Sequence, residues 1–330
     1  MTGPAVEKRI IVKNLKIFPP LALAPMVGLS HTAMRSLVQE QGGVGLLFTE
    51  MLAARSLPDE NERHSPLLIR SATEKPLFYQ LFLNEIDQVE PAVRQLLKFD
   101  AHGIDLNLGC PAPKLRKQGA GCYLVRDHKH LSAVVARLRK ATDLPLSAKI
   151  RLGDQLDTVA LASLCRMLEG EGIDLLTVHG RLHGEKFCRK PRWDWIGKVK
   201  DMVSIPVLAN GGIFSVEDAR ICLRMSQADG LMVGRGAAWR PWLLADIGRE
   251  IYGIPDSCTR VGREQVYFRF IELLTERFPR ERRLGRLKQF THYFAGTYTF
   301  GHHLATAVQT SDSVEQAAGR AKEFFDQPSC

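Results

Sequence analysis

Residues 103–121 read GIDLNLGCPAPKLRKQGAG, and the rest of the chain is interpreted from this stretch. The apolar residues of its first half alternate with Asp105 and Asn107, as expected for a buried strand that carries polar side chains toward its C-terminal end. The glycine and proline that follow would end the strand and place Cys110 in a turn. A strand that ends on polar groups and a thiol is a candidate part of an active site.

Three cations, Lys114, Arg116 and Lys117, follow Cys110 closely in the chain. Nearby positive charge would favour the thiolate of Cys110 or bind an anion. The alternative is that Cys110 is a small apolar side chain packed at the end of a strand. Only the context supplied by the other segments distinguishes the two interpretations.

Composition limits the class of protein. The 330 residues can form one large domain, or a large domain and a small one. Hydrophobic residues make up 45% and charged residues 25%, which is typical of a soluble globular protein. No apolar run approaches the ~20 residues that a membrane-spanning helix needs. The N-terminus shows no export signal, so we expect a cytoplasmic location.

Cysteine spacing and net charge add two expectations. The 7 cysteines are scattered and include no CxxC pair, which argues for reduced thiols and against a zinc site, so no bound metal is expected. The formal net charge of +9 suits a polyanionic partner, although basic charge alone is a weak indication.

Short apolar runs of β type recur along the chain, and most are followed by an amphipathic helical pattern. The runs are LALAP (21–25), GLLFTE (45–50), LFYQLF (77–82), GIDLNLG (103–109), PLSAKIR (145–151), DLLTVHG (174–180), PVLANGG (206–212) and GLMVGRG (230–236). Eight such units predict an α/β fold, the (β/α)8 TIM barrel, for which about 250 residues are typical. The rival doubly wound sheet requires a glycine-rich fingerprint after its first strand, and residues 25–28 (PMVG) do not provide one.

In such a barrel, polar residues at the C-terminal ends of the strands converge on one mouth. Lys149 is unusual in a β run and indicates function, although it could be an edge charge that reaches solvent. His179, taken alone, could be a core histidine, and the glycines of residues 210–212 and 234–236 could be plain turns. After the seventh and eighth strands, however, glycine-bearing loops commonly bind phosphate, and Arg235 would add a charged contact.

The segments LAPMVGLSHTAMRSL, DLNLGCP followed by GAG, AKIRLG, TVHGR, VLANGGI and GLMVGRGA occur in an order and spacing that resembles the flavin-dependent tRNA-dihydrouridine synthases. The similarity is strong over residues 20–242 and weak beyond them. It implies a bacterial-type enzyme with an FMN-binding barrel and a small helical domain. NADPH would reduce the flavin, and the flavin would reduce uridine in the tRNA D-loop to 5,6-dihydrouridine.

The resemblance also assigns roles to residues. Cys110 matches the proton donor, which would protonate C5 of uracil while hydride reaches C6. Asn107 and Arg181 would hold a base that has left its stack. The positions that match the flavin-binding residues are Pro25, Met26, Val27, Gln80, Lys149, His179, Asn210, Gly211, Gly212, Gly234 and Arg235. Two departures from the family pattern affect substrate contacts: Pro113 precedes Lys114, and residues 182–193 lack the usual threonine and glutamine.

The strand pattern stops near residue 255, and three amphipathic stretches follow. We therefore expect a barrel domain at 1–245 and a helical tRNA-recognition domain at 246–330. Cations from Arg277 to Lys288, including Arg286, would form a groove for the tRNA backbone together with the loop at 181–192. RLKQF (286–290) faintly resembles the subgroup that acts at position 16, but the position stays open.

Two other functions remain open. An FMN barrel that oxidises or reduces a free metabolite, similar to dihydroorotate dehydrogenase, would also use a cysteine at a strand end. A tRNA-binding protein without activity would bind no flavin, and the set of Lys149, His179 and Arg235 argues against it. No feature of the sequence predicts an oligomer or a stable protein partner, so a monomer is expected.

Overall fold

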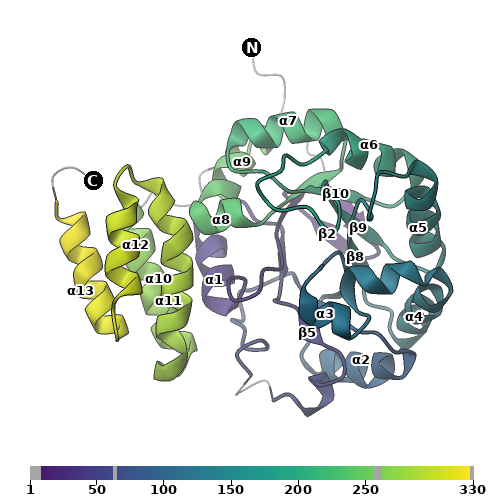
Figure 1. The fold of residues 1–330 in the computed structure, drawn as a ribbon, viewed down its shortest axis with the longest axis horizontal. Coiled ribbons are helices and arrows are strands. Elements are labelled where there is room, and N and C mark those ends of the chain that lie inside the picture. The colour runs from purple at the N-terminus through teal and green to yellow at the C-terminus, as the bar shows by residue number, and fades with distance from the viewer. Residues whose placement is uncertain (1–8, 62–64, 256–261, 328–330) are drawn as a thin grey trace.

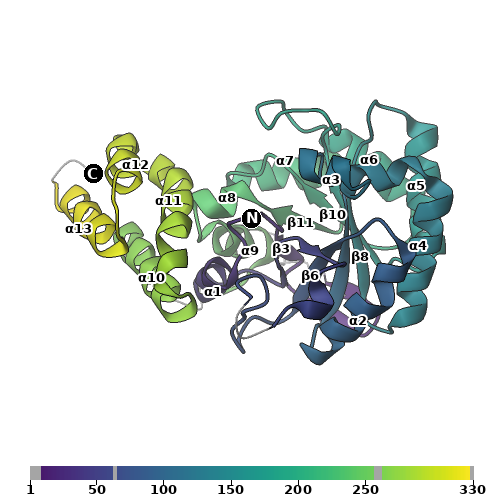
Figure 2. The same ribbon diagram turned by 60° about the horizontal axis from the view of Figure 1, so that its bottom comes forward.

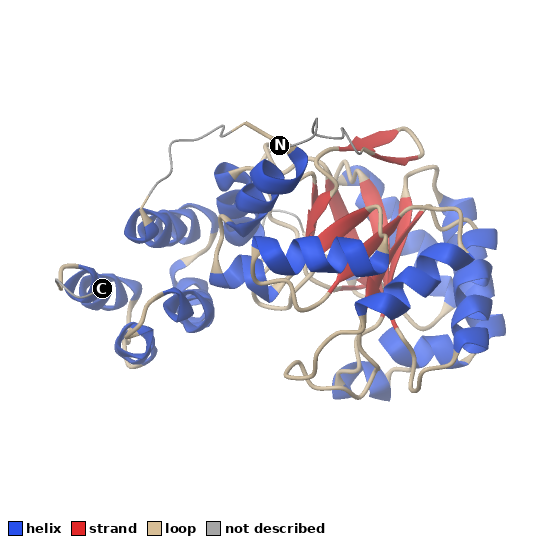
Figure 3. Ribbon diagram, turned by 90° about the horizontal axis from the view of Figure 1, so that it is seen from above, coloured by secondary structure: helices blue, strands red, loops and turns tan. Residues whose placement is uncertain are grey.

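The computed structural model describes residues 9–61, 65–255 and 262–327. At its centre is a closed ring of parallel strands (Figure 1; the strands are red in Figure 3), in which neighbours pair in chain order and the last strand pairs with the first. They are β3 (Leu21–Leu23), β4 (Leu46–Phe48), β6 (Leu77–Phe82), β7 (Gly103–Leu108), β8 (Leu146–Arg151), β9 (Leu175–His179), β10 (Val207–Asn210) and β11 (Gly230–Val233). The predicted (β/α)8 barrel is therefore confirmed.

Helices surround the strands, and Figure 2 shows them on the outside of the ring. They are α1 (Thr32–Gln41), α2 (Val89–Lys98), α3 (Pro113–Lys117), α4 (His128–Ala141), α5 (Thr158–Gly170), α6 (Trp193–Met202), α7 (Val216–Ser226), α8 (Arg235–Trp239) and α9 (Leu243–Tyr252). Side chains accept hydrogen bonds from backbone N–H groups at the start of three of them, namely Asp127 for α4, Asp157 for α5 and Ser215 for α7. Such caps set where each helix begins.

The alternation along β7 determines which of its side chains face the barrel interior. Ile104 and Leu108 are fully buried and belong to the apolar cluster shared with the surrounding helices. Asp105 and Asn107 must then point inward, because successive residues of a strand face opposite sides. The polar residues expected at the end of this strand therefore lie inside the barrel.

Two short elements were not predicted. An antiparallel hairpin of β1 (Ile10–Val12) and β2 (Leu15–Ile17) contributes apolar residues to the same cluster as Leu46 and Leu175, which line the barrel interior near the start of their strands. The hairpin thus closes the end of the barrel opposite the C-terminal mouth. A two-residue strand, β5 (Leu52–Ala53), pairs with the end of β6.

Four further helices form a bundle beside α1 and α8 (Figure 1). They are α10 (Arg263–Arg277), α11 (Arg283–Phe294), α12 (Gly301–Gln309) and α13 (Val314–Phe325). The bundle core is aromatic, and the rings of Phe270 and Phe290 stack with their centroids 3.8 Å apart. The three helices expected from the sequence are present, and α12 is an addition. Helix α9 spans the boundary expected at residue 245 and packs against α1 and α7.

Within the described ranges, no helix is long and apolar enough to cross a membrane. Nor do His, Cys, Asp or Glu side chains of those ranges gather in groups of three or more that could hold a metal ion.

Candidate active site at the C-terminal mouth of the barrel

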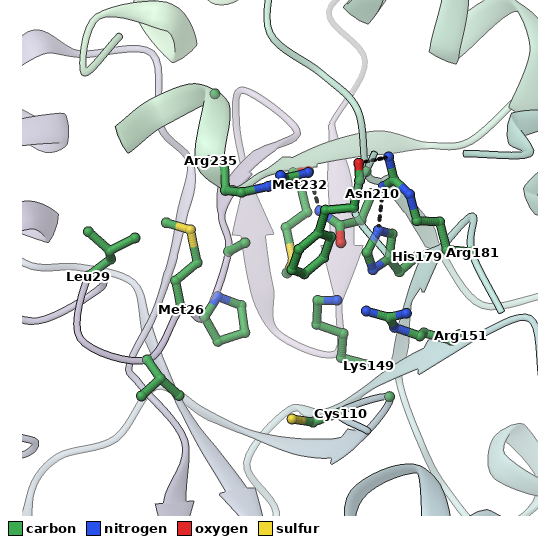
Figure 4. Close-up of a pocket in the computed structure, with 18 of the residues that line it drawn as sticks. Met26, Leu29, Cys110, Lys149, Arg151, His179, Arg181, Asn210, Met232 and Arg235 are labelled. Atoms are coloured by element: carbon green, nitrogen blue, oxygen red, sulfur yellow. Dashed lines mark hydrogen bonds between the residues drawn. The ribbon is translucent and has the colours of Figure 1, made fainter. Parts of the chain in front are cut away.

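A cavity of about 310 Å³ opens where the strands end (Figure 4). Its lining includes the residues predicted for catalysis and for binding the flavin and the base: Pro25, Met26, Val27, Gln80, Asn107, Cys110, Lys149, His179, Arg181, Asn210, Gly211, Gly212, Gly234 and Arg235. Arg286 and Lys288, predicted to contact the substrate, lie on α11 outside this lining. Side chains from all parts of the barrel thus meet in one cavity.

A chain of hydrogen bonds crosses the buried side of the cavity. Ser147 Oγ donates to Asp105 Oδ1 (2.5 Å), and Gln80 Nε2 donates to Asp105 Oδ2 (2.6 Å). Asn107 Nδ2 donates to Gln80 Oε1 (2.8 Å), and Asn107 Oδ1 accepts from the backbone N–H of Cys110 (3.1 Å). The turn that carries the thiol is thereby fixed to the interior of the barrel.

The cations that act on Cys110 differ from those expected in the sequence. Lys114, Arg116 and Lys117 are exposed on or at the end of α3, and none of them lines the cavity. The electrostatic partners of the Cys110 thiol are instead Lys149 and Arg151, at the end of β8. The reason is geometric, because β8 is the neighbour of β7 in the ring, whereas the cations of α3 are exposed to solvent.

Lys149 and Asp105 occupy neighbouring strands and influence each other's charge. Burial lowers the pKa of Lys149 to about 8, the cation of Arg151 acts in the same direction, and the Asp105 carboxylate opposes the change. Burial raises the pKa of Asp105 to about 6, against the hydrogen bonds from Ser147 and Gln80. Both groups therefore titrate closer to neutrality than they would in water.

His179 is held as a neutral ring. Its Nε2 lies 2.9 Å from Arg181 Nη1, and because a guanidinium can only donate, Nε2 accepts and the ring proton resides on Nδ1. Burial and the nearby cations, Lys149 first among them, place the pKa of His179 well below its usual value. The other donors of Arg181 bind the carbonyls of Phe187 and Arg189, so Arg181 also holds the loop that follows β9.

The loop after β9 places an exposed aromatic ring over the cavity. The ring of Phe187 is 52% exposed and stacks on His179 with centroids 6.1 Å apart. Its centroid lies 4.2 Å from the guanidinium carbon of Arg235 and 5.7 Å from that of Arg151. Sequence reasoning did not single out Phe187, because it falls in the stretch that departs from the family pattern.

The glycines after β10 lie where a side chain would collide with neighbouring residues. Gly211 has a φ of +109°, and a Cβ there would lie 2.5 Å from the His179 ring. Gly212 has a φ of +73°, and its Cβ would lie 2.7 Å from Pro191. The carbonyl of Gly211 accepts from Trp193 Nε1 (2.9 Å), which fixes the turn. These positions favour glycine for conformational as well as steric reasons.

Helix α11 contributes two residues to the cavity, Gln289 and Tyr293. Gln289 Nε2 donates to the carbonyl of Val27 (3.2 Å), and the phenol of Tyr293 interacts electrostatically with Arg235. They stand four residues apart on a helix, a spacing that also fits an ordinary packed face, so no local pattern could have revealed them.

The two predicted substrate residues of α11 have different surroundings. The guanidinium of Arg286 is half-buried, lies 4.2 Å from the centroid of the Phe278 ring, and interacts with the Glu50 carboxylate. Lys288 is partly exposed. Arg286 thus joins the bundle to the barrel in addition to any role toward a ligand.

A family model described as "Dihydrouridine synthase (Dus)" matches residues 22–326. A tRNA-dihydrouridine(16) synthase of Neisseria meningitidis serogroup B is 31% identical over 314 residues, which cover 92% of this chain and 94% of that protein. A tRNA-dihydrouridine synthase B of Pseudomonas syringae pv. tomato is 35% identical over 228 residues, 69% of this chain and 67% of that protein.

Among solved structures, the histamine dehydrogenase from Rhizobium sp. 4-9 is similar to this chain with a TM-score of 0.58 and 11% sequence identity. The match covers 82% of this chain and 51% of the dehydrogenase. At this identity the likeness concerns the barrel fold alone.

Proposed function

Since the chain belongs to the dihydrouridine synthase family, we propose that it uses FMN and NADPH to reduce the C5–C6 double bond of a uridine in the tRNA D-loop, with Cys110 as the proton donor. The observation that carries this proposal is the convergence of Cys110, Lys149 and His179 with the two glycine-bearing loops on one cavity.

The charges around the cavity suit FMN. Among the described residues that line it, Lys149, Arg151, Arg181 and Arg235 are cationic and none is acidic. Their charges favour a phosphate and an electron-rich ring. Residues 210–212 and 234–236 line the cavity and would receive the phosphate with backbone N–H groups.

The flavin-facing residues would bind and orient. Bound flavin would supply the reducing equivalents that come from NADPH. Lys149 and the second N–H of the Gln80 amide would hold the polar edge of the ring, and Pro25 to Val27 would lie beside it. The cation of Lys149 would stabilise negative charge at that edge.

Cys110 would complete the addition of two hydrogens to uridine. Its thiol would donate a proton to C5 of the base, and solvent would reprotonate the thiolate. Asn107 keeps one amide N–H beyond its bond to Gln80, and that N–H is available to a carbonyl of the base. Lys149 and Arg151 would stabilise the thiolate that the proton transfer leaves.

Residues 246–330 would recognise tRNA. The segment from Arg277 to Lys288 carries several cations on α11, the helix that reaches the cavity, and in the turn before it. Contacts of this kind position a nucleic acid without selecting a base. The reactive uridine would have to leave its stack to reach Cys110.

The test is nucleoside mass spectrometry of tRNA lacking dihydrouridine after incubation with the purified protein and NADPH. A gain of two hydrogens on uridine is expected, and fragment mapping of the product identifies the position. Cys110→Ala should keep the yellow cofactor and lose the reaction by roughly 100-fold or more. Cys188→Ala, which changes an exposed thiol on the neighbouring loop, is the matched control and should keep it. A yellow protein that oxidises NADPH and leaves tRNA unchanged would favour a metabolite oxidoreductase.

A further inference from the structure

The hydrogen-bonded chain inside the barrel begins with three residues that stand in register. Gln80 of β6 pairs with Asp105 of β7, and Asp105 pairs with Ser147 of β8. All three side chains are almost completely buried, with 0%, 0% and 1% exposed. Barrel interiors are ordinarily filled by branched apolar side chains, so a polar layer at this place has a cost in stability and calls for an explanation.

Both ends of this hydrogen-bonded chain impose the same donor-to-acceptor direction on its hydrogen bonds. At one end the Asp105 carboxylate can only accept, so Gln80 must turn its amide nitrogen toward it. At the other end the backbone nitrogens of Gly109 and Cys110 can only donate, so Asn107 must turn its amide oxygen toward them. The bond between Asn107 Nδ2 and Gln80 Oε1 is the one arrangement that satisfies both ends.

We propose that Asp105 is a positioning residue for the reaction: its carboxylate sets the direction of this chain, which turns a free amide N–H of Gln80 and of Asn107 toward the cavity and holds the turn that bears Cys110. This inference rests on the proposed function for the identity of the ligands: the polar edge of the flavin ring would accept from Gln80, and a carbonyl of the uridine base would accept from Asn107. The position of the Cys110 turn follows from the hydrogen bonds alone and does not depend on the proposed function.

These hydrogen bonds explain why four residues on three strands, Gln80, Asp105, Asn107 and Ser147, act as a unit. Gln80 and Asn107 each use one amide hydrogen inside the chain and retain a second one at the cavity wall. If the acceptor at residue 105 were lost, the amide of Gln80 could rotate, and Asn107 would then lose the partner that fixes its oxygen toward Cys110. A change far from the thiol would thereby move the thiol.

The experiment uses the flavin-loaded enzyme and the variants Asp105→Ala, Asp105→Asn and Gln80→Met. Thr177→Val is the matched control, because Thr177 is fully buried inside the same barrel and its hydroxyl has no hydrogen-bond partner among the described residues. Three quantities are measured: the alkylation rate of Cys110 by iodoacetamide relative to the exposed Cys188, the FMN dissociation constant, and kcat and KM with tRNA.

Asp105→Ala should change the alkylation ratio, weaken FMN binding and lower kcat by roughly 10- to 100-fold with little change in KM for tRNA. Asp105→Asn should restore the alkylation ratio, because the N–H groups of Gly109 and Cys110 select the orientation in which the new amide oxygen accepts from Gln80 and its nitrogen donates to Ser147. Thr177→Val should match the wild type in all three measurements.

A folded Asp105→Ala variant with the wild-type alkylation ratio, FMN affinity and kcat would overturn the proposal. So would Asp105→Asn as damaging as Asp105→Ala, since a hydrogen-bond acceptor would then not suffice. If Asp105→Ala does not fold, Gln80→Met decides, because it breaks the link between Asp105 and Asn107. A wild-type alkylation ratio in that variant would overturn the proposal. If the wild type reduces no uridine, the proposed function fails. The alkylation ratio still tests whether Asp105 holds the Cys110 turn through these hydrogen bonds.

Discussion

Replacing Asp105 by Asn should make the protein more stable at neutral pH while preserving the hydrogen bonds of the site. Burial raises the pKa of Asp105 from 3.8 to about 6, so the folded state binds the proton more tightly than the unfolded chain does. Folding stability attributable to this group is therefore complete at low pH and is lost as the pH rises through the interval between the two values. An uncharged amide of the same shape avoids that loss.

The size of the effect follows from the pKa difference. Linkage gives a cost of about 3 kcal/mol at pH 8 and about 1.5 kcal/mol at pH 5, at ~1.4 kcal/mol for each pKa unit. Urea unfolding of the wild type and Asp105→Asn at these two pH values measures it, with Thr177→Val as a control whose difference from the wild type should not depend on pH. The stability gain of Asp105→Asn should grow by about 1.5 kcal/mol between pH 5 and pH 8. A gain that is independent of pH would refute the reasoning, because Asp105 would then titrate alike in the folded and unfolded chains.

Three further predictions concern other parts of the molecule. Because the pKa of Lys149 is lowered to about 8, its positive charge is lost as the pH rises through that value. In a profile of kcat against pH, kcat of the wild type should therefore fall above about pH 8, whereas kcat of Lys149→Arg should not. Gln289→Ala should raise the FMN dissociation constant, measured by fluorescence titration, by roughly fivefold, which corresponds to the loss of one hydrogen bond of about 1 kcal/mol. Glu74→Ala should lower the free energy of urea unfolding by about 3–5 kcal/mol, because it leaves the buried Arg35 charge unpaired, whereas Glu40→Ala at a partly exposed ion pair should lower it by no more than about 1 kcal/mol.

The barrel was predictable from sequence because its signals are local. Each strand is a short apolar run in the sequence. The residue after the run lies at the C-terminal mouth of the barrel, whatever the position of the helix that follows. The alternation in β7 was sufficient to place Asn107 and Cys110 at one end of the strand, and the predicted catalytic, flavin and base-contact residues accordingly line one cavity.

What the sequence could not provide were relationships between distant segments. The cations nearest Cys110 in the chain are exposed, and those that act on it come from the next strand. Phe187 lies over the cavity because Arg181 binds the carbonyls of its loop, and this contact depends on the path of the loop rather than on composition. The contribution of α11 depends on how the bundle packs against the barrel, which no periodicity encodes.

The contact between bundle and barrel is part of the cavity wall, and this changes what a truncation would test. Gln289 reaches the carbonyl of Val27, whose neighbour Gly28 donates its N–H to Glu50 Oε2 (2.5 Å). Burial raises the pKa of Glu50, and the Arg286 cation on α11 opposes that change. Cutting the chain near residue 245 would therefore remove Gln289 from the cavity and the Arg286 charge from Glu50 together with the tRNA-binding surface. Loss of flavin from such a fragment would follow from the missing wall, so the role of the bundle in tRNA binding is better tested by single changes of exposed cations in the intact chain.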